Sequence, residues 1–231
     1  MCGRYVLRRI DAVRRAVQFV APMFEEFTEH PRFNIAPSQI VPVIRQGEHG
    51  RELVPMKWGF IPSWTKGKPK LAPINAKCET VATSGMFRTV FQKRRCLVPA
   101  DGFYEWKGAK PPKQPYFIHR RDDGWFAFAG LWDRWVAEKG SEPIDTFTIV
   151  TTEPNELMRT IHNRMPVILN PNDFDAWLKH PTPELLKPAP PDEMEAFPVA
   201  TKVNKPSYDA PDCVERNADV SPTAHSMRFH E

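Results

Sequence analysis

WFAFAGLW, at residues 125–132, is the middle one of three closely spaced β-rich runs, between PYFIHR at 115–120 and DTFTIVTT at 145–152. Aromatic and β-branched residues favour strands because they pack well on a pleated surface. The residues RDDG, which separate the first two runs, are typical of a turn. The sequence therefore predicts that the three runs pair into a sheet.

Strand patterns also precede this region. Within residues 34–60, the apolar segments IVPVI and ELVPMKWGF are separated by QGEHG, which predicts strands joined by a hairpin. RCLVPADGFYEW, at residues 95–106, predicts a strand, a turn and a second strand. Apolar residues at helical spacing occur in four short segments: 10–20, 86–94, 155–162 and 172–180. In the last segment, Asn172 or Asp173 is placed to cap the helix.

Proline is the unusual feature of the composition. The chain has 231 residues and 25 of them are proline, about twice the usual share of roughly 5%. Proline breaks helix interiors and is excluded from central strands, so we expect short elements joined by turns. No internal repeat or linker divides the chain. The prediction is one α+β domain over residues 1–218, with a mixed, mainly antiparallel sheet, a barrel-like core and a few short helices, followed by a loose tail at 219–231.

Charge and cysteine content narrow the classes of function. The 32 Lys and Arg residues exceed the 28 Asp and Glu residues by four, which permits a polyanionic partner without requiring one. The four cysteines are far apart and form no C-x-x-C pair, so neither a disulfide framework nor a zinc site is indicated. No apolar run approaches 18 residues and no secretory leader is seen. We expect a cytoplasmic protein, nucleoid-associated if bacterial, with no metal, no cofactor and no membrane partner.

Four polar stretches are candidates for chemistry. They are CGR at 2–4, INAKCET at 74–80, GFYEW at 102–106 and IHNRMP at 161–166. Each also has an ordinary structural explanation. Asn75 could shape a loop, Glu105 could be the outward residue of a strand, and His162 could be a histidine near a helix end. A sequence does not show whether the four stretches meet in space.

Together, the four stretches would supply the groups needed for addition to a carbonyl. If Met1 is removed, Cys2 carries a free α-amine beside its thiol, which no internal cysteine can provide. Asn75 adds an amide that can hold an oxygen, Glu105 a carboxyl group and His162 an imidazole. An α-amine has a pKa of about 7.7–8.0, so part of it is neutral and nucleophilic at physiological pH.

Several motifs make the chain resemble a known family. They are MCGRY, FNIAPSQ, WGFIPSW, INAKCET, MFRTVFQKRRCLVPADGFYEWK, FAFAGLW, FTIVTTEPNELMRTIHNRMPVIL and PVATKVN. In order and spacing they resemble the SRAP family, the SOS-response-associated peptidase fold that processes abasic sites in single-stranded DNA. The resemblance runs from residue 2 to about residue 205 and implies a single SRAP-like domain with this activity.

The resemblance implies a role for each catalytic candidate. Cys2 would be the nucleophile, exposed when Met1 is lost, with both its amine and its thiol joining the aldehyde of a ring-opened abasic sugar. Asn75 would position the sugar and phosphate at the lesion. Glu105 would transfer protons, and His162 would assist ring opening and cleavage.

The resemblance also implies that Arg4 and Arg164 contact DNA phosphate, as Lys77 would if it takes the family's basic position, and Gly3 and Trp64 are further expected DNA-binding residues. Many members carry arginine at the position of Lys77, and lysine lacks the planar fork that grips a phosphate in two places. Some members have a basic residue where this chain has Gly85. Arg4 is also expected to lower the pKa of the nearby thiol.

Three tryptophans, Trp58, Trp64 and Trp106, lie in or beside the matching motifs and could stack on bases. Most tryptophans in a protein belong to the core because they bury a large area. Trp64, in the polar loop PSWTKGKPK, is the preferred exposed candidate.

The expected product is a covalent crosslink in which Cys2 and the abasic-site aldehyde form a thiazolidine. AP-lyase activity and self-processing that removes Met1 are further expected activities. The partner would be single-stranded DNA with abasic sites, including sites at junctions with duplex, and the protein would be a monomer. Two alternatives stay open: a cysteine peptidase that uses Cys2 and His162, and a non-catalytic single-strand binding module.

Overall fold

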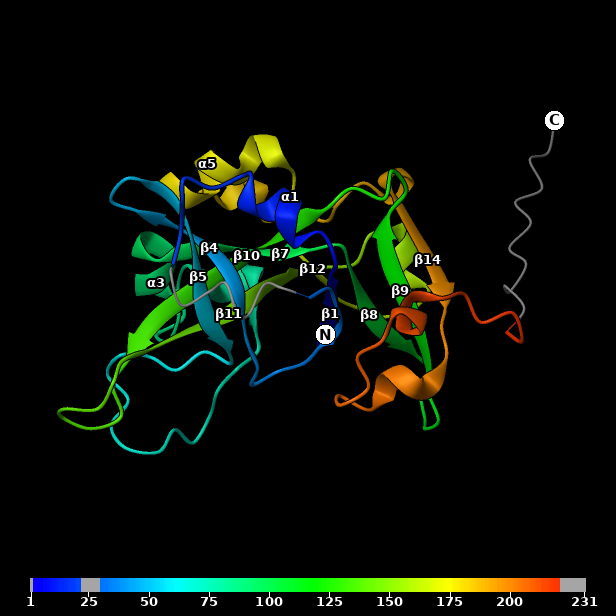
Figure 1. The fold of residues 1–231 in the computed structure, drawn as a ribbon, viewed down its shortest axis with the longest axis horizontal. Coiled ribbons are helices and arrows are strands. Elements are labelled where there is room, and N and C mark those ends of the chain that lie inside the picture. Colours follow the sequence, from blue (N-terminus) through cyan, green and yellow to red (C-terminus); the bar gives the residue numbers. More distant parts are fainter. Residues whose placement is uncertain (1, 22–29, 221–231) are drawn as a thin grey trace.

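A closed β-barrel forms the larger half of the protein (Figure 1). The structure is a computed structural model that describes residues 2–21 and 30–220. The five strands of the barrel are β4 (Ile40–Gly47), β5 (Gly50–Trp58), β7 (Arg95–Ala100), β10 (Phe126–Trp135) and β11 (Ile144–Thr152). In the order β5, β4, β7, β10, β11 neighbours are antiparallel, and a parallel pairing between β11 and β5 closes the ring. Short strands extend this sheet, with β2 (Phe19–Val20) on β5, β6 (Asn75–Lys77) and β12 (Met165–Pro166) on β11, and β13 (Ile168–Leu169) on β10.

A second sheet of five strands lies beside the barrel, on the right in Figure 1. Its order is β14 (Met194–Pro198), β9 (Gln114–Arg120), β8 (Gly102–Lys107), β1 (Arg4–Leu7) and β3 (Arg32–Ile35), and every pair is antiparallel. The helices are short, and along the chain they alternate with groups of strands: α1 (Ile10–Arg14), α2 (Cys78–Val81), α3 (Arg88–Lys93), α4 (Glu156–Arg159) and α5 (Phe174–Lys179). The proline-rich segment 181–193 contains two short 3₁₀ turns, Pro183–Leu185 and Pro191–Glu193. The predicted fold class, α+β with a barrel-like core and mainly antiparallel pairing, is confirmed.

The N-terminal strand is fixed to the barrel by its aromatic side chain. Tyr5 of β1 is fully buried, and its ring meets Trp58 at 5.4 Å and Phe128 at 5.8 Å, both edge to face. Such pairs contribute about 0.5–1.5 kcal/mol each beyond the burial of area. Because these contacts fix the direction of β1, they also fix the residues that precede it.

The predicted pairing of the three β-rich runs is only partly right. β10 and β11 pair along their length, but β9, which contains PYFIHR, belongs to the second sheet and pairs with β8 and β14. The RDDG turn therefore carries the chain from one sheet to the other. The same crossing occurs between β7 and β8 at Asp101, so residues 95–106 form the expected strand, turn and strand but in two sheets.

Both crossings are held by the same two arginines. The buried Asp101 accepts hydrogen bonds from the Arg9 side chain at 2.6 Å and from the Arg9 backbone N–H at 3.1 Å. Asp123, in the RDDG turn, pairs with Arg8 at 3.1 Å and with Arg9. Gly102 follows Asp101, and a Cβ at this position would lie 2.5 Å from the ring of Phe117.

Other local predictions have mixed outcomes. The hairpin within 34–60 is confirmed as β4 and β5, and helices occur within all four predicted segments. The helix predicted over 10–20 ends at Arg14, because Phe19 and Val20 pair with β5 instead. Asp173 stands at the start of α5, but neither it nor Asn172 makes a capping hydrogen bond through its side chain. The predicted tail, 219–231, lies almost wholly outside the described residues.

Candidate active site

Strand pairing brings Cys2 to Glu105. In the antiparallel register between β1 and β8, Arg4 lies opposite Tyr104, so the residues just before Arg4 run beside the end of GFYEW. Cys2 is fully buried, Glu105 is 4% exposed, and Gly3 between Cys2 and Arg4 is partly exposed. A thiol and a carboxyl group are thus held together in a nearly dry environment.

The Cys2 thiol is in its protonated form at neutral pH. Burial raises its pKa far above the ordinary value, and the negative charge of Glu105 raises it further. The expectation that Arg4 gives the thiol a lowered pKa is therefore wrong: a hydrogen bond with the Arg4 backbone does lower the pKa, but burial and the charge of Glu105 outweigh it. The physical reason is that loss of hydration destabilises the thiolate more than any nearby cation stabilises it.

His162 joins this pair from the loop between α4 and β12. Its Nε2 lies 3.6 Å from Oε1 of Glu105, and its Nδ1 accepts a hydrogen bond of 3.0 Å from the backbone N–H of Arg164. The loop that carries it is held at the end of α4, where the His162 N–H donates to the carbonyl of Met158 at 2.8 Å. Asn155 caps α4 by accepting from the Met158 N–H at 2.9 Å.

Arg164 is engaged with its own protein. Its guanidinium pairs with both carboxylate oxygens of Glu79, at 2.5 Å and 3.0 Å, and donates to the carbonyl of Thr151 at 2.7 Å. Pairing with Arg164 lowers the pKa of Glu79 to about 2, and the same pairing raises the pKa of Arg164. The Arg164 side chain is only 16% exposed, against 50% for Glu79.

Asn75 lies on β6, which pairs in parallel with β11 through Asn75 and Ile149. Both polar atoms of its side chain are buried, and neither has a hydrogen-bond partner among the described residues. Such groups are rare in folded proteins and often mark functional positions. Lys77 ends the same strand and is exposed, opposite Thr151, the residue that also binds Arg164.

Arg4 lies over an aromatic platform. Its Cζ is 5.9 Å from the centre of the Trp106 ring, and Trp106 in turn donates from Nε1 to Oδ1 of Asn204 at 2.7 Å. The Nε of Arg4 is buried and has no hydrogen-bond partner among the residues that the structure describes. Burial lowers the pKa of Arg4 from its ordinary value.

Trp58 and Trp64 have opposite environments. Trp58 is fully buried, stacks on Phe147 at 6.2 Å and donates to the carbonyl of Ile74 at 3.0 Å, so it supports the strand of Asn75 and cannot stack on a base. Trp64 is 56% exposed, as expected.

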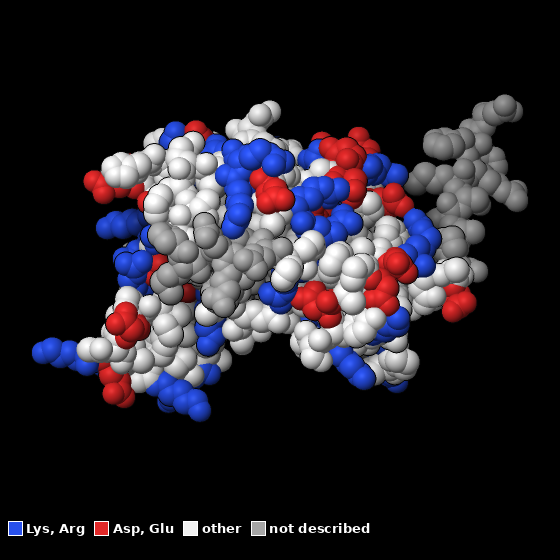
Figure 2. Space-filling view, viewed as in Figure 1, with Lys and Arg blue, Asp and Glu red and all other residues white. Residues whose placement is uncertain are grey.

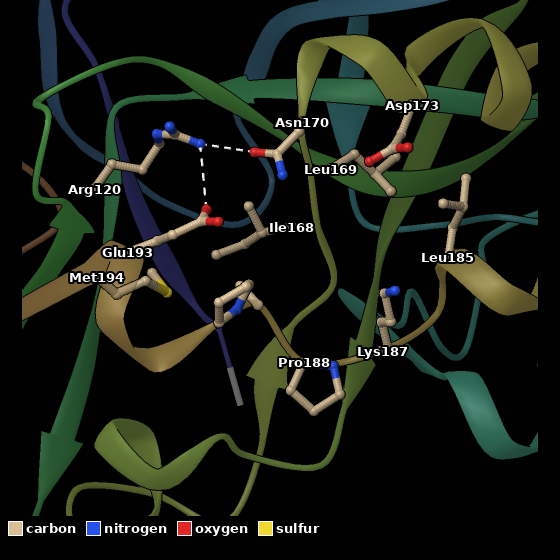
Figure 3. A pocket seen from close by; sticks show the side chains of 12 residues that line it. Arg120, Ile168, Leu169, Asn170, Asp173, Leu185, Lys187, Pro188, Glu193 and Met194 are labelled. Carbon is tan, nitrogen blue, oxygen red and sulfur yellow. Dashed lines mark hydrogen bonds and ion pairs between the residues drawn. The ribbon is translucent and has the colours of Figure 1, made fainter.

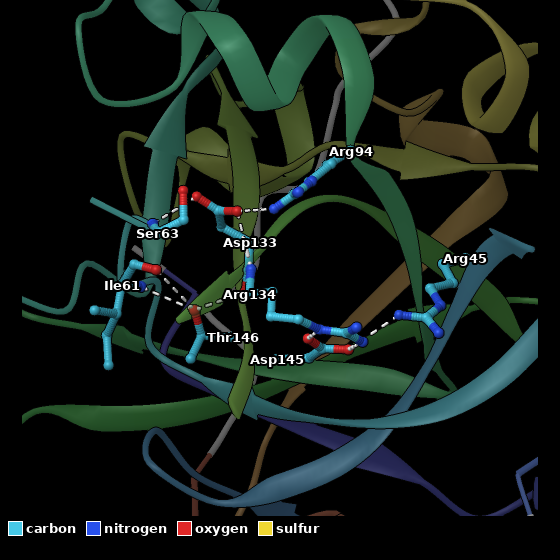
Figure 4. A network of polar contacts seen from close by, with 8 residues as sticks. All are labelled: Arg45, Ile61, Ser63, Arg94, Asp133, Arg134, Asp145 and Thr146. Atoms are coloured by element: carbon cyan, nitrogen blue, oxygen red, sulfur yellow. Dashed lines mark hydrogen bonds and ion pairs between the residues drawn. The ribbon is translucent and has the colours of Figure 1, made fainter. Parts of the chain in front are cut away.

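The loop around Trp64 is fixed by hydrogen bonds to two barrel strands (Figure 4). The Ser63 N–H donates to Asp133 at 2.7 Å and the Ile61 N–H donates to Thr146 at 2.9 Å. Trp135 donates from its ring to the Thr65 carbonyl at 2.8 Å. The exposed ring is therefore held out on a rigid loop.

The structure thus brings Cys2, Glu105 and His162 together, with Arg164 bound to His162 and Arg4 close to Cys2 in the chain. Asn75 and Lys77 lie on the strand next to β11, whereas Trp64 lies on a separate loop. Sequence reasoning missed Glu79, Thr151 and Asn204. Glu79 could have been found, since it stands in INAKCET two residues after Lys77.

Other features of the molecule bear on what the site can hold. All four cysteines are free thiols. Over residues 2–21 and 30–220, no cluster of three or more His, Cys, Asp or Glu side chains could hold a metal ion, and no helix is long and apolar enough to cross a membrane. On the face in Figure 2, basic and acidic side chains are interspersed. In a separate cavity beside β13 and β14, Arg120 makes a hydrogen bond to Asn170 and an ion pair with Glu193 (Figure 3), and none of the predicted site residues lines this cavity.

Comparisons with known proteins agree with this picture. A family model described as SOS response associated peptidase (SRAP) matches residues 1–206. The abasic site processing protein YoqW of Bacillus subtilis (strain 168) is 42% identical, over 93% of this chain and 99% of that protein. The abasic site processing protein HMCES of Gallus gallus is 34% identical, over 93% of this chain and 77% of that protein. A crystal structure of a protein from Bacteroides thetaiotaomicron is 27% identical, with a TM-score of 0.81 over 94% of this chain and 100% of that chain.

Proposed function

Because this chain belongs to the SRAP family, we propose that it processes abasic sites in single-stranded DNA by forming a covalent crosslink through Cys2. The observation that carries the proposal is the cluster of thiol, carboxyl and imidazole groups formed by Cys2, Glu105 and His162. Relatives at 34–42% identity over nearly the whole chain are named as abasic site processing proteins.

The reaction needs an α-amine and a thiol on the same residue. Once Met1 is removed, the Cys2 amine attacks the aldehyde of the open abasic sugar, and loss of water gives an imine. The sulfur then adds to the imine carbon, the nitrogen takes up a proton, and a five-membered thiazolidine closes. The net change is one aldehyde plus one aminothiol giving one thiazolidine and one water, with no oxidation or reduction.

The environment of the thiol suggests the order of these steps. Because burial keeps the Cys2 thiol protonated, the amine is the first nucleophile. Glu105, whose charge acts on the thiol, is the base that receives the S–H proton as the sulfur attacks. The Nδ1 of His162 accepts a hydrogen bond, so its Nε2 carries the N–H, which faces Glu105 and can donate a hydrogen bond to the sugar oxygen during ring opening.

DNA binding is assigned to residues around this cluster. Arg4 and Lys77 would contact phosphates, and the amide of Asn75, which has no hydrogen-bond partner among the described residues, would hold the sugar or phosphate at the lesion. Arg164 has one Nη1 N–H left for a phosphate, since its other exposed donors already bind Glu79 and Thr151. Trp64 would stack on a base, and Gly3, which has no side chain, would allow the DNA strand to approach the protein backbone.

Two side activities follow from the same chemistry. The imine intermediate can lose the 3′ phosphate by β-elimination, which is AP-lyase activity, if ring closure by the thiol is slow. Removal of Met1 by the protein itself would be a peptidase-like event. A general cysteine peptidase is less well supported, because the charged group that acts on the thiol is the Glu105 carboxylate.

The test compares three proteins on a denaturing gel with an abasic oligonucleotide: wild type, Cys2→Ala, and a variant with residues ahead of Cys2 that cannot be trimmed. Wild type should give a heat-stable one-to-one crosslink. Cys2→Ala keeps an amine and could nick the strand, but it cannot close the ring. The extended protein has an amide nitrogen, whose lone pair is delocalised, and should form neither imine nor thiazolidine.

A heat-stable crosslink from the extended protein, with its terminus confirmed by mass, would overturn the aminothiol mechanism. Repeated turnover of peptides would favour the peptidase. Equal binding of intact and abasic strands with no crosslink would favour a non-catalytic binding module.

A further inference from the structure

We propose that Arg164 is a positioning residue, which, clamped by Glu79 and Thr151, holds His162 in the tautomer that presents an N–H to Glu105. The consequence for catalysis rests on the proposed function. The tautomer itself is a property of the protein without DNA and can be measured separately.

The clamp joins three elements that are distant in the chain. Arg164 precedes β12, Glu79 lies in α2, and Thr151 lies in β11. The two bonds to Glu79 and the bond to the Thr151 carbonyl, at 2.5 Å, 3.0 Å and 2.7 Å, hold the planar guanidinium from two directions. Paired bonds of this kind are stronger and more directional than a single contact. The backbone at Arg164 is therefore fixed together with its side chain.

The fixed backbone determines which nitrogen of His162 carries the proton. The Arg164 N–H points at Nδ1 from 3.0 Å, and a nitrogen that accepts a hydrogen bond cannot carry a proton itself. The proton of the neutral ring is therefore on Nε2, the nitrogen 3.6 Å from Oε1 of Glu105. In the other tautomer, two N–H groups would face each other at Nδ1, and a lone pair would face the carboxylate at Nε2.

This arrangement also explains why Arg164 is so little exposed. A residue whose main role is to bind phosphate would present its fork to solvent, yet the Arg164 side chain is 16% exposed. Its Nε is buried without a hydrogen-bond partner among the described residues. The donors that would grip a phosphate in two places are directed instead to Glu79.

The test is the ¹⁵N NMR spectrum of the histidine rings in the DNA-free protein at a pH where the rings are neutral. The chain has seven histidines, so a His162→Gln variant identifies the signals of His162. Wild type should show Nδ1 as the acceptor nitrogen and Nε2 as the protonated one. Arg164→Ala should convert this single form into a mixture, and Arg164→Lys, which keeps the charge but loses the fork, should do so in part.

The matched control is Arg159→Ala. Arg159 lies in α4 close to the same loop, and among the described residues its side chain makes only a long hydrogen bond of 3.4 Å to the carbonyl of Pro154. It should leave the His162 signals unchanged. If Arg164→Ala does not fold, Glu79→Gln loosens the same clamp from the other side and should also produce a mixture.

A single unchanged tautomer in Arg164→Ala and Glu79→Gln would overturn the proposal, and so would a proton on Nδ1 in wild type. The crosslinking rate of the clamp variants gives the second readout. We expect a loss of up to about 100-fold, the size of effect that small misplacements of a catalytic group produce. If wild type itself fails to crosslink abasic DNA, the proposed function fails, but the NMR result still decides the role of Arg164.

Discussion

Replacing Asn75 with leucine should make the protein more stable and less active. Both polar atoms of the Asn75 amide are buried, and neither has a hydrogen-bond partner in the described part of the chain. A buried donor or acceptor without a partner costs about 1–3 kcal/mol of stability. Leucine has a similar size and no polar atom, so it removes that cost while keeping the side chain's volume.

The expected gain in unfolding free energy is about 2 kcal/mol, the middle of that range. For a chain of this length, each kcal/mol raises the melting temperature by about 2–4 °C, so the midpoint should rise by about 4–8 °C. Activity should move the other way, because the lost amide can no longer hold the sugar or phosphate. The loss of one hydrogen bond of about 1.4 kcal/mol slows the reaction about tenfold.

Urea denaturation and single-turnover crosslinking measure the two quantities. The matched control is Asn34→Leu, the same substitution at an amide whose nitrogen, unlike that of Asn75, is hydrogen-bonded, although its Oδ1 also has no partner among the described residues. Asn34 is fully buried, and its Nδ2 donates to the carbonyls of Val203, Lys205 and Tyr208 at 3.1, 3.0 and 2.7 Å. It should lose about 2 kcal/mol or more, because those carbonyls are left unpaired. If Asn75→Leu is destabilised as Asn34→Leu is, the amide of Asn75 is satisfied in solution and the reasoning is refuted.

Four further predictions concern other parts of the site. Glu105→Gln should slow crosslinking by about 10²–10⁴ and leave DNA affinity nearly unchanged, and an unaltered rate would refute its acid/base role. The logarithm of the affinity for single-stranded DNA should fall against the logarithm of the salt concentration with a slope of about −2, as expected for three phosphate contacts. Arg4→Ala and Lys77→Ala should each make this slope shallower by about 0.7, and an affinity that does not depend on salt would contradict these contacts. Trp64→Ala should weaken single-strand binding by about 1–3 kcal/mol without changing stability, since the ring is 56% exposed, and unchanged affinity in titrations would exclude stacking. Glu79→Gln should lower the stability of the protein at neutral pH, because pairing with Arg164 lowers the pKa of Glu79 to about 2. The stability that this ion pair contributes is complete above about pH 4.5 and disappears as the pH falls toward 2. A difference in denaturation midpoints that does not change with pH would contradict this prediction.

Local sequence patterns predict most of the helices and strands of the fold, but not which of the two sheets each strand belongs to. The β4–β5 hairpin follows from short-range turn chemistry, which a single sequence contains. The crossings at Asp101 and Asp123 depend on ion pairs with Arg8 and Arg9, about a hundred residues away in the chain. Periodicity over a short window cannot show such a contact, and the predicted pairing of PYFIHR with the strand that follows it is therefore wrong.

The candidate site shows the same division. The residue types in CGR, GFYEW and IHNRMP indicated carbonyl chemistry, but their meeting depends on the register of β1 with β8 and on the loop after α4. From the sequence, only the family resemblance indicates that these residues belong to one site. The expected direction of the Cys2 pKa shift is wrong because burial, a property of the whole fold, outweighs the charge of a neighbour in the chain.

The most direct test of the central claim is the intact mass of the protein after mixing with an abasic oligonucleotide under denaturing conditions. We predict one species whose mass equals the protein without Met1 plus one oligonucleotide less one water, and digestion should place the linkage on Cys2. A covalent product that retains Met1, a linkage on another residue, or no covalent product at all would contradict the account.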